Sequence, residues 1–104
     1  MKEKIENMLL DLGITPNLKG FQYLSRAIEL VVFDKAKNIC IDIYECIAKE
    51  TKSTKACVER CIRHAISKID IETNNLKCGL KNSEVIYTLA LKIKQQEAEQ
   101  NEQN

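Results

Sequence analysis

Residues 43–69 have the sequence IYECIAKETKSTKACVERCIRHAISKI, in which two helical patterns flank a short polar segment. In the first pattern, Ile39, Ile43 and Ile47 recur at four-residue spacing and define one apolar face. Residues 51–53 have the length and polarity of a tight turn, although they lack the glycine often found there. The stretch therefore predicts a helix-turn-helix, an arrangement that can insert its second helix into the major groove of DNA.

The second helix, expected over 54–69, carries apolar and polar residues on opposite sides. Thr54 is a suitable N-cap, because its hydroxyl can accept a hydrogen bond from a first-turn backbone N–H. The apolar side of the helical wheel holds Val58, Ile62, Ala65, Ile66 and Ile69. The opposite side holds Ala56, Glu59, Arg60, Arg63, His64 and Ser67. An apolar stripe of this width must be buried against other helices, so the polar side points outward.

The outward side has the chemistry of a groove reader. Arginine pairs with guanine and glutamate accepts from the amino group of cytosine, so Arg60 and Glu59 are candidate base readers. The small Ala56 and Cys57 let the backbone approach base edges. The candidate phosphate contacts are Ser53, Thr54, Lys55, Arg63 and His64. A solvated amphipathic helix is the alternative interpretation of the same pattern.

The preceding helix and the charge distribution favour the DNA-binding interpretation. Ala48 lies ten residues before Val58, and a small residue at that point lets the two helices cross closely while the valine packs between them. The net charge of the 104 residues is only +1, yet residues 49–68 hold six basic and two acidic side chains. Positive charge concentrated on one motif is the expected electrostatic footprint of a nucleic-acid-binding surface.

Four ordered blocks resemble one known family. Residues 58–66, VERCIRHAI, resemble the recognition helix of the C-terminal effector domain of stage-zero sporulation protein A, a response regulator that starts sporulation. The other blocks are residues 14–24 (ITPNLKGFQYL), residues 47–50 (IAKE) and residues 82–86 (NSEVI). The resemblance covers roughly residues 5 to 94, and the order of the blocks makes it more specific than a helix-turn-helix pattern alone.

This resemblance implies an all-α, DNA-binding transcription regulator. It implies that residues at the positions of Glu59 and Arg60 read bases and that those at Arg63 and His64 hold the backbone. Members bind a short asymmetric DNA box, often as head-to-tail pairs on tandem boxes, so double-stranded DNA and a second copy are the expected partners, and the transcription machinery is a further one.

The chain departs from the family pattern at several points. Cys57 stands where the family usually has an arginine that touches DNA. The connection between the second and third helices is about two residues shorter. The stretch from Asp70 to Lys81 is also shorter, and Lys77 or Lys81 is the candidate replacement for a basic residue that reaches DNA from that connection. The sequence also contains no receiver domain.

Composition indicates one small domain. Scarce glycine and proline, and no long strand-like alternation, predict an all-α fold of about five helices over 1–94, followed by a polar, disordered tail over 95–104. We expect helices over 2–12, ended by Gly13, over 20–33, and from an N-cap at Ser83. The apolar side of that last helix is expected to hold Val85, Ile86, Leu89, Leu91 and Ile93.

The five cysteines indicate reduced thiols in the cytoplasm, because the count is odd and no signal peptide or membrane-spanning stretch is visible. The simplest interpretation makes small core residues of Cys40, Cys46, Cys61 and Cys78. Two alternatives stay open. Cys57, Cys61 and His64 have the spacing of zinc ligands along one helix edge, with Cys78 as a fourth, although paired Cys-x-x-Cys knuckles are missing. Alternatively, Cys57 beside cations is a redox-sensitive thiol.

The sequence holds no constellation of nucleophile, base and oxyanion donor, so we expect neither an enzyme nor a cofactor. The predicted function is sequence-specific binding of double-stranded DNA to regulate transcription, with residues 54–69 in the major groove. The alternative is a protein-interaction module that pairs with a full-length response regulator and modulates it. Retention of both Arg60 and Arg63 on the outward face favours DNA.

Overall fold

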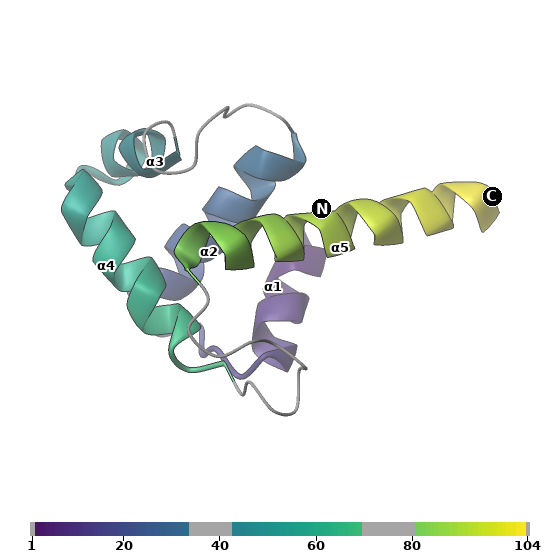
Figure 1. Ribbon diagram of the computed structural model, residues 1–104, viewed down its shortest axis with the longest axis horizontal. Helices are drawn as coiled ribbons and strands as arrows, with labels where there is room; N and C mark the ends of the chain where they lie inside the picture. Colours follow the sequence, from purple (N-terminus) through teal and green to yellow (C-terminus); the bar gives the residue numbers. More distant parts are fainter. Residues whose placement is uncertain (1, 34–42, 70–80, 104) are drawn as a thin grey trace.

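The computed structural model describes residues 2–33, 43–69 and 81–103, with side chains up to residue 97. These residues contain five helices and no strand (Figure 1). In chain order the helices are α1 Lys2–Asp11, α2 Lys19–Val32, α3 Tyr44–Thr51, α4 Lys55–Ile66 and α5 Asn82–Gln103. The all-α fold predicted from the sequence is confirmed, as is the helix-turn-helix, which α3 and α4 form.

Helix α2 is the centre of the fold and packs against each of the other four helices. Its inner side provides Phe21, Leu24 and Ile28, none of which is more than 2% exposed. Full burial of such side chains contributes about 1.5–3 kcal/mol each through removal of apolar surface from water. Helices α3 and α4 both pack against α2, so this buried helix supports the helix-turn-helix.

Helix α1 ends as the sequence predicts. Gly13 has a φ of 95°, a conformation that side chains rarely adopt, and its N–H donates to the Leu10 carbonyl at 3.0 Å. The next N–H, of Ile14, donates to the Leu9 carbonyl at 3.1 Å. These two bonds satisfy carbonyls that would otherwise be left unpaired at the end of the helix, so the chain turns toward α2 without leaving the core.

Helix α5 differs from three expectations. It begins at Asn82, so Ser83 lies inside the first turn and is not the N-cap. Leu91 is 57% exposed, because the buried side follows Val85, Ile86, Leu89, Ala90 and Ile93. The helix continues to Gln103 through the stretch expected as a disordered tail. Its glutamine, glutamate and alanine residues are good helix formers, and Lys4 Nζ of α1 lies 2.9 Å from Glu97 Oε1.

Several expectations fall outside the described residues: the positions of Ile39, Cys40, Lys77 and Cys78. Within the described ranges, no helix combines the length and the apolar character needed to cross a membrane.

Candidate nucleic-acid interface

The turn between α3 and α4 is made without glycine. Lys52 takes the left-handed conformation (φ 56°, ψ 42°) that a glycine would adopt more cheaply. The following N–H, of Ser53, donates to the Ala48 carbonyl at 2.8 Å and closes the end of α3. The turn predicted from the sequence is confirmed. Because it contains no glycine, Lys52 adopts the strained left-handed conformation.

The start of α4 is capped by Thr54, as predicted. The backbone N–H of Cys57 donates to Thr54 Oγ1 at 3.1 Å, and Thr54 itself has an extended backbone. This bond fixes the first turn of α4 directly after the turn residues. Because that turn carries Lys55 and Ala56, both exposed, the cap also fixes where the leading end of the helix points.

Helices α3 and α4 pack against each other. Ala48 is 7% exposed and Val58 is fully buried, which agrees with the prediction that both lie on the inner sides of the two helices. On the other side of α3, Glu50 accepts from the Arg26 guanidinium of α2 through both oxygens, at 2.7 and 3.0 Å. Arg26 also pairs with Glu29. The bidentate pair ties α3 to α2 and lowers the pKa of the Glu50 carboxyl.

Helices α2 and α4 approach each other at Gly20. A Cβ built there would lie 2.1 Å from the Cys61 carbonyl oxygen and 2.7 Å from the Ala65 Cβ. Real atoms do not approach so closely, so only glycine permits this crossing. The sequence reasoning did not identify this role; the signal was present only as a glycine in the first turn of a predicted helix, where its partner cannot be seen.

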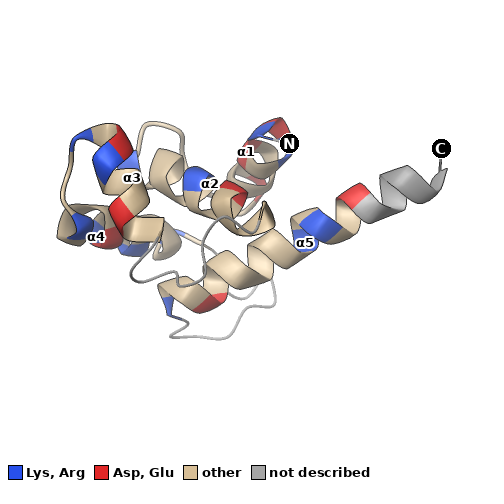
Figure 2. Ribbon diagram, turned by 90° about the horizontal axis from the view of Figure 1, so that it is seen from above, with Lys and Arg blue, Asp and Glu red and all other residues tan. Residues whose placement is uncertain are grey.

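The apolar stripe of α4 is buried as predicted, but the helix is shorter than the expected 54–69. Val58, Ile62 and Ala65 are fully buried and Ile66 is partly buried. The helix ends at Ile66, so Ser67 and Ile69, the latter 6% exposed, lie beyond its end. The predicted outward residues are exposed at Ala56, Arg60, Arg63, His64 and Ser67, and partly buried at Glu59. Figure 2 shows Lys and Arg on both helices of the helix-turn-helix, with acidic residues among them. The structure therefore brings the predicted cationic residues together on one solvent-facing helix surface.

Arg60 lies in the middle of this surface. On the helical wheel it falls between Ala56 and His64, directly opposite the buried stripe. It is exposed and forms no ion pair or hydrogen bond with any other described residue. Its guanidinium is therefore available to a ligand without breaking an internal contact.

Glu59 lies at one edge of the surface, facing the start of α5. Asn82 Nδ2 donates to the Glu59 backbone carbonyl at 3.2 Å and to its Oε1 at 3.4 Å. Arg63 lies 3.6 Å from Glu59 Oε2 on its other side. The carboxylate therefore has one neighbour at each oxygen, and a cytosine amino group would share the carboxylate with them.

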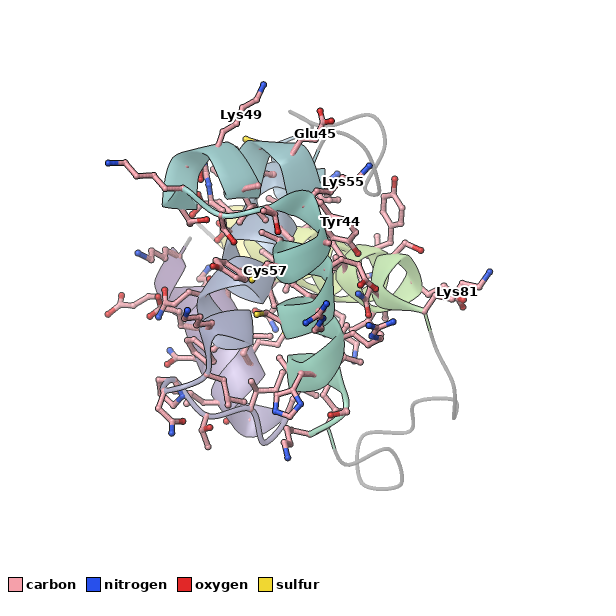
Figure 3. All side chains as sticks on the ribbon, turned by 90° about the vertical axis from the view of Figure 1, so that its left-hand side faces the viewer. Tyr44, Glu45, Lys49, Lys55, Cys57 and Lys81 are labelled. Atoms are coloured by element: carbon pink, nitrogen blue, oxygen red, sulfur yellow. The ribbon has the colours of Figure 1, made fainter. Side chains whose placement is uncertain are left out.

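Two lysines flank the same edge. Figure 3 looks onto α4 and shows Lys55 and Lys81 on the side of the helix where α5 begins. Both are exposed. Lys81 directly precedes α5, so the Asn82 contact with α4 keeps Lys81 beside the helix. Of the two candidate lysines between α4 and α5, Lys81 therefore lies beside the outward surface of α4, and Lys77 lies outside the described residues.

Cys57 lies at the opposite edge, toward α2 (Figure 3). Its Sγ is 4.0 Å from Cys61 Sγ. Hydrogen bonds from the Ser53 hydroxyl and from the Cys61 thiol lower the pKa of Cys57, with help from the charge of Lys19. Within the described part of the chain, no three His, Cys, Asp or Glu side chains gather closely enough to hold a metal ion, so His64 does not join the two thiols.

Comparison with known families identifies the chain. The family described as "Sporulation initiation factor Spo0A C terminal" matches residues 5–93, which include all of α2, α3 and α4 and most of α1 and α5. This range nearly coincides with the one over which the sequence resembles the effector domain. The family is a regulatory one and not a known family of enzymes. The chain belongs to the Spo0A C-terminal family and is, by that membership, a DNA-binding regulator of sporulation.

Proposed function

We propose that this protein binds double-stranded DNA sequence-specifically by placing the outward face of α4 in the major groove. The observation that carries the proposal is Arg60, an exposed guanidinium that pairs with no other described residue and lies opposite the buried stripe of a capped helix. A planar guanidinium in that position can donate two parallel hydrogen bonds to guanine. Exposed Ala56, one turn earlier, leaves room for the helix to approach the base edges.

The remaining side chains support this geometry from the two edges. Lys55 and Lys81 provide positive charge on the α5 side (Figure 3), and Arg63 lies beside Glu59. His64 is exposed on α4, and Ser53 lies beside Cys57. These residues suit phosphate contacts, which position a protein on DNA without reading its sequence. We assign Glu59 a supporting role in base reading, because its carboxylate is already engaged by Asn82 and Arg63.

The experiment compares two arginines one helical turn apart. Fluorescence anisotropy measures the Kd for a duplex carrying the family's box and for a scrambled duplex, at several salt concentrations. Arg60→Ala should weaken binding to the box by about 1–3 kcal/mol, with little change on the scrambled duplex. Arg63→Ala should weaken both duplexes equally and reduce the slope of log Kd against log salt by about one. Lys92→Ala, exposed on α5, is the control and should change neither.

Equal loss on both duplexes for Arg60→Ala would remove Arg60 as a base reader. Weak, equal and steeply salt-dependent binding by the unmodified protein would refute sequence-specific binding to that box. That result would favour the alternative function, pairing with a full-length response regulator. A duplex with two boxes in tandem extends the same measurement, since head-to-tail pairing predicts tighter binding to two boxes than to one.

A further inference from the structure

Two thiols lie together on the edge of α4 that faces the first turn of α2. Cys57 and Cys61 are one helical turn apart, their sulfur atoms are separated by 4.0 Å, and both side chains are partly exposed. A disulfide bond is about 2.05 Å long, so these atoms need to approach by about 2 Å to bond. Among the described cysteines, Cys46 lies on a different helix and provides an isolated thiol for comparison.

The two positions have different reactivity. Hydrogen bonds from Ser53 and Cys61, and the charges of Lys19 and Arg60, lower the pKa of Cys57. Burial and the hydrogen bond to Cys57 raise the pKa of Cys61. Cys57 is thus the thiol that ionises first, and Cys61 is the protonated thiol beside it. This pairing of a partly exposed, ionisable sulfur with a neighbouring thiol is the arrangement that oxidants attack selectively.

We propose that Cys57 is a site of oxidation by peroxides and that Cys61 resolves the product into a disulfide within α4. In the first step, the Cys57 thiolate attacks hydrogen peroxide, the O–O bond breaks, and a sulfenic acid and hydroxide form. In the second step, the Cys61 sulfur attacks the Cys57 sulfur and the S–O bond breaks. The sulfenic hydroxyl leaves with the Cys61 proton as water, so two thiols are oxidised and the peroxide is reduced.

The product cannot fit an undistorted helix. Cβ atoms of residues four apart on a helix are about 5–6 Å apart, whereas those of a disulfide are about 3.5–4.5 Å apart. The first two turns of α4 must therefore deform. Those turns begin at the Thr54 cap and include Arg60, which lies between the two cysteines in sequence. Oxidation should therefore displace the residues on the outward face.

The chemical step stands independently of the proposed function, and only its effect on DNA binding depends on it. The two can fail separately. If the reduced protein does not prefer the box, the proposed function fails while the disulfide can still form. If the reduced protein prefers the box but no bond links Cys57 to Cys61 after oxidation, the inference fails and the proposed function stands.

The sequence provides a direct assay for the bond. Trypsin cleaves after Lys55, Arg60 and Arg63, so the two cysteines fall on separate peptides, Ala56–Arg60 and Cys61–Arg63. The reduced full-length protein is treated with hydrogen peroxide, alkylated, digested and analysed by mass spectrometry. We expect the two peptides to be joined by a disulfide, and we expect reduction with dithiothreitol to separate them and to restore duplex binding.

Three variants sharpen the test. Cys61→Ser should leave Cys57 as a sulfenic acid that dimedone traps, and Cys57→Ser should abolish the linked peptide. Cys46→Ser should behave as the unmodified protein in both assays. Cys46 is the matched control because its Sγ lies 3.6 Å from Glu50 Oε1, and burial and that carboxylate raise the pKa of its thiol.

The rates supply the expected magnitude. The fraction of thiol present as thiolate rises tenfold for each unit by which the pKa falls. A less basic thiolate is also a weaker nucleophile, and this offsets about half of the gain in the logarithm of the rate. Cys57 should therefore react about threefold faster than Cys46 for each unit that separates their pKa values. Any of three results would overturn the proposal. They are equal oxidation rates for Cys57 and Cys46, a disulfide that joins other cysteines, and failure of dimedone to trap a sulfenic acid at Cys57 in the Cys61→Ser variant.

Discussion

Replacing Gly20 by alanine tests how α2 positions α4. The new Cβ would lie 2.1 Å from the Cys61 carbonyl oxygen, whereas ordinary contacts are about 3.5–4.0 Å. The obstacle is backbone, so no side-chain rotation relieves it, and the helices must separate by about 1 Å or more. Such overpacking costs about 1–3 kcal/mol or more, while alanine's higher helix propensity returns at most about 1 kcal/mol. The clash therefore outweighs the propensity.

We expect Gly20→Ala to lower the free energy of unfolding by about 1–3 kcal/mol, or the Tm by roughly 5–20 °C for a chain of this size. Urea and thermal unfolding followed by far-UV circular dichroism measure both. Gln22→Ala, exposed on the same helix, is the control and should stay within about 0.5 kcal/mol of the unmodified protein. Below its unfolding temperature the Gly20 variant should also bind the box duplex more weakly, because α4 is displaced.

A second substitution identifies the clashing atom. Adding Ala65→Gly removes the 2.7 Å contact between Cβ atoms but leaves the shorter contact with the Cys61 carbonyl oxygen. It also introduces a glycine into α4, which costs about 1 kcal/mol. The double variant should therefore be no more stable than Gly20→Ala. Recovery of stability in the double variant, or a Gly20→Ala protein as stable as the unmodified one, would refute the close crossing.

Three further predictions concern the helix-turn-helix. Lys52→Gly should raise the urea midpoint, since it relieves a left-handed lysine and stabilises by about 1 kcal/mol after the entropy cost of glycine; an unchanged midpoint would contradict a strained turn. Thr54→Ala should destabilise by about 0.5–2 kcal/mol in the same assay, whereas Thr54→Ser should not, because serine keeps the capping oxygen. Finally, Arg26 lowers the pKa of Glu50, so this pair stabilises the fold above the ordinary carboxyl pKa of 4.5 and loses its effect as the pH falls through the lowered value. Glu50→Gln should therefore flatten the fall in the free energy of unfolding below about pH 4.5. The change should be less than about 1 kcal/mol, because both side chains are more than a third exposed. An acid profile identical to that of the unmodified protein would exclude the pair as a contributor.

The sequence predicted the features that are local. The 3.6-residue periodicity identified Val58, Ile62 and Ala65 as buried, and the position of Thr54 before an apolar run identified the cap. These depend on contacts within one helix, which spacing along the chain encodes directly. The resemblance of four ordered blocks added the family, which the match over residues 5–93 confirms.

The sequence could not predict contacts between distant elements. Nothing near Gly20 in sequence indicates that the Cys61 carbonyl occupies the space of its missing side chain. Likewise, Asn82 is 23 residues from Glu59, so its hold on a predicted base reader appears only in the fold. Leu91 was misplaced for a related reason: an apolar residue near a helical stripe need not lie on it, and here 57% of it is exposed.

Cys61 belongs both to the close crossing at Gly20 and to the thiol pair. Its position determines which side of α4 can deform. The Cys61 carbonyl already lies where a Cβ on Gly20 would sit, so α4 has no room to move toward α2. Its buried stripe likewise fills the space toward the core. A contraction between Cys57 and Cys61 must then be absorbed on the remaining side, where Arg60 faces solvent. The packing of α4 against α2 and the core thereby directs the distortion that the proposed disulfide would cause toward the surface that would read DNA.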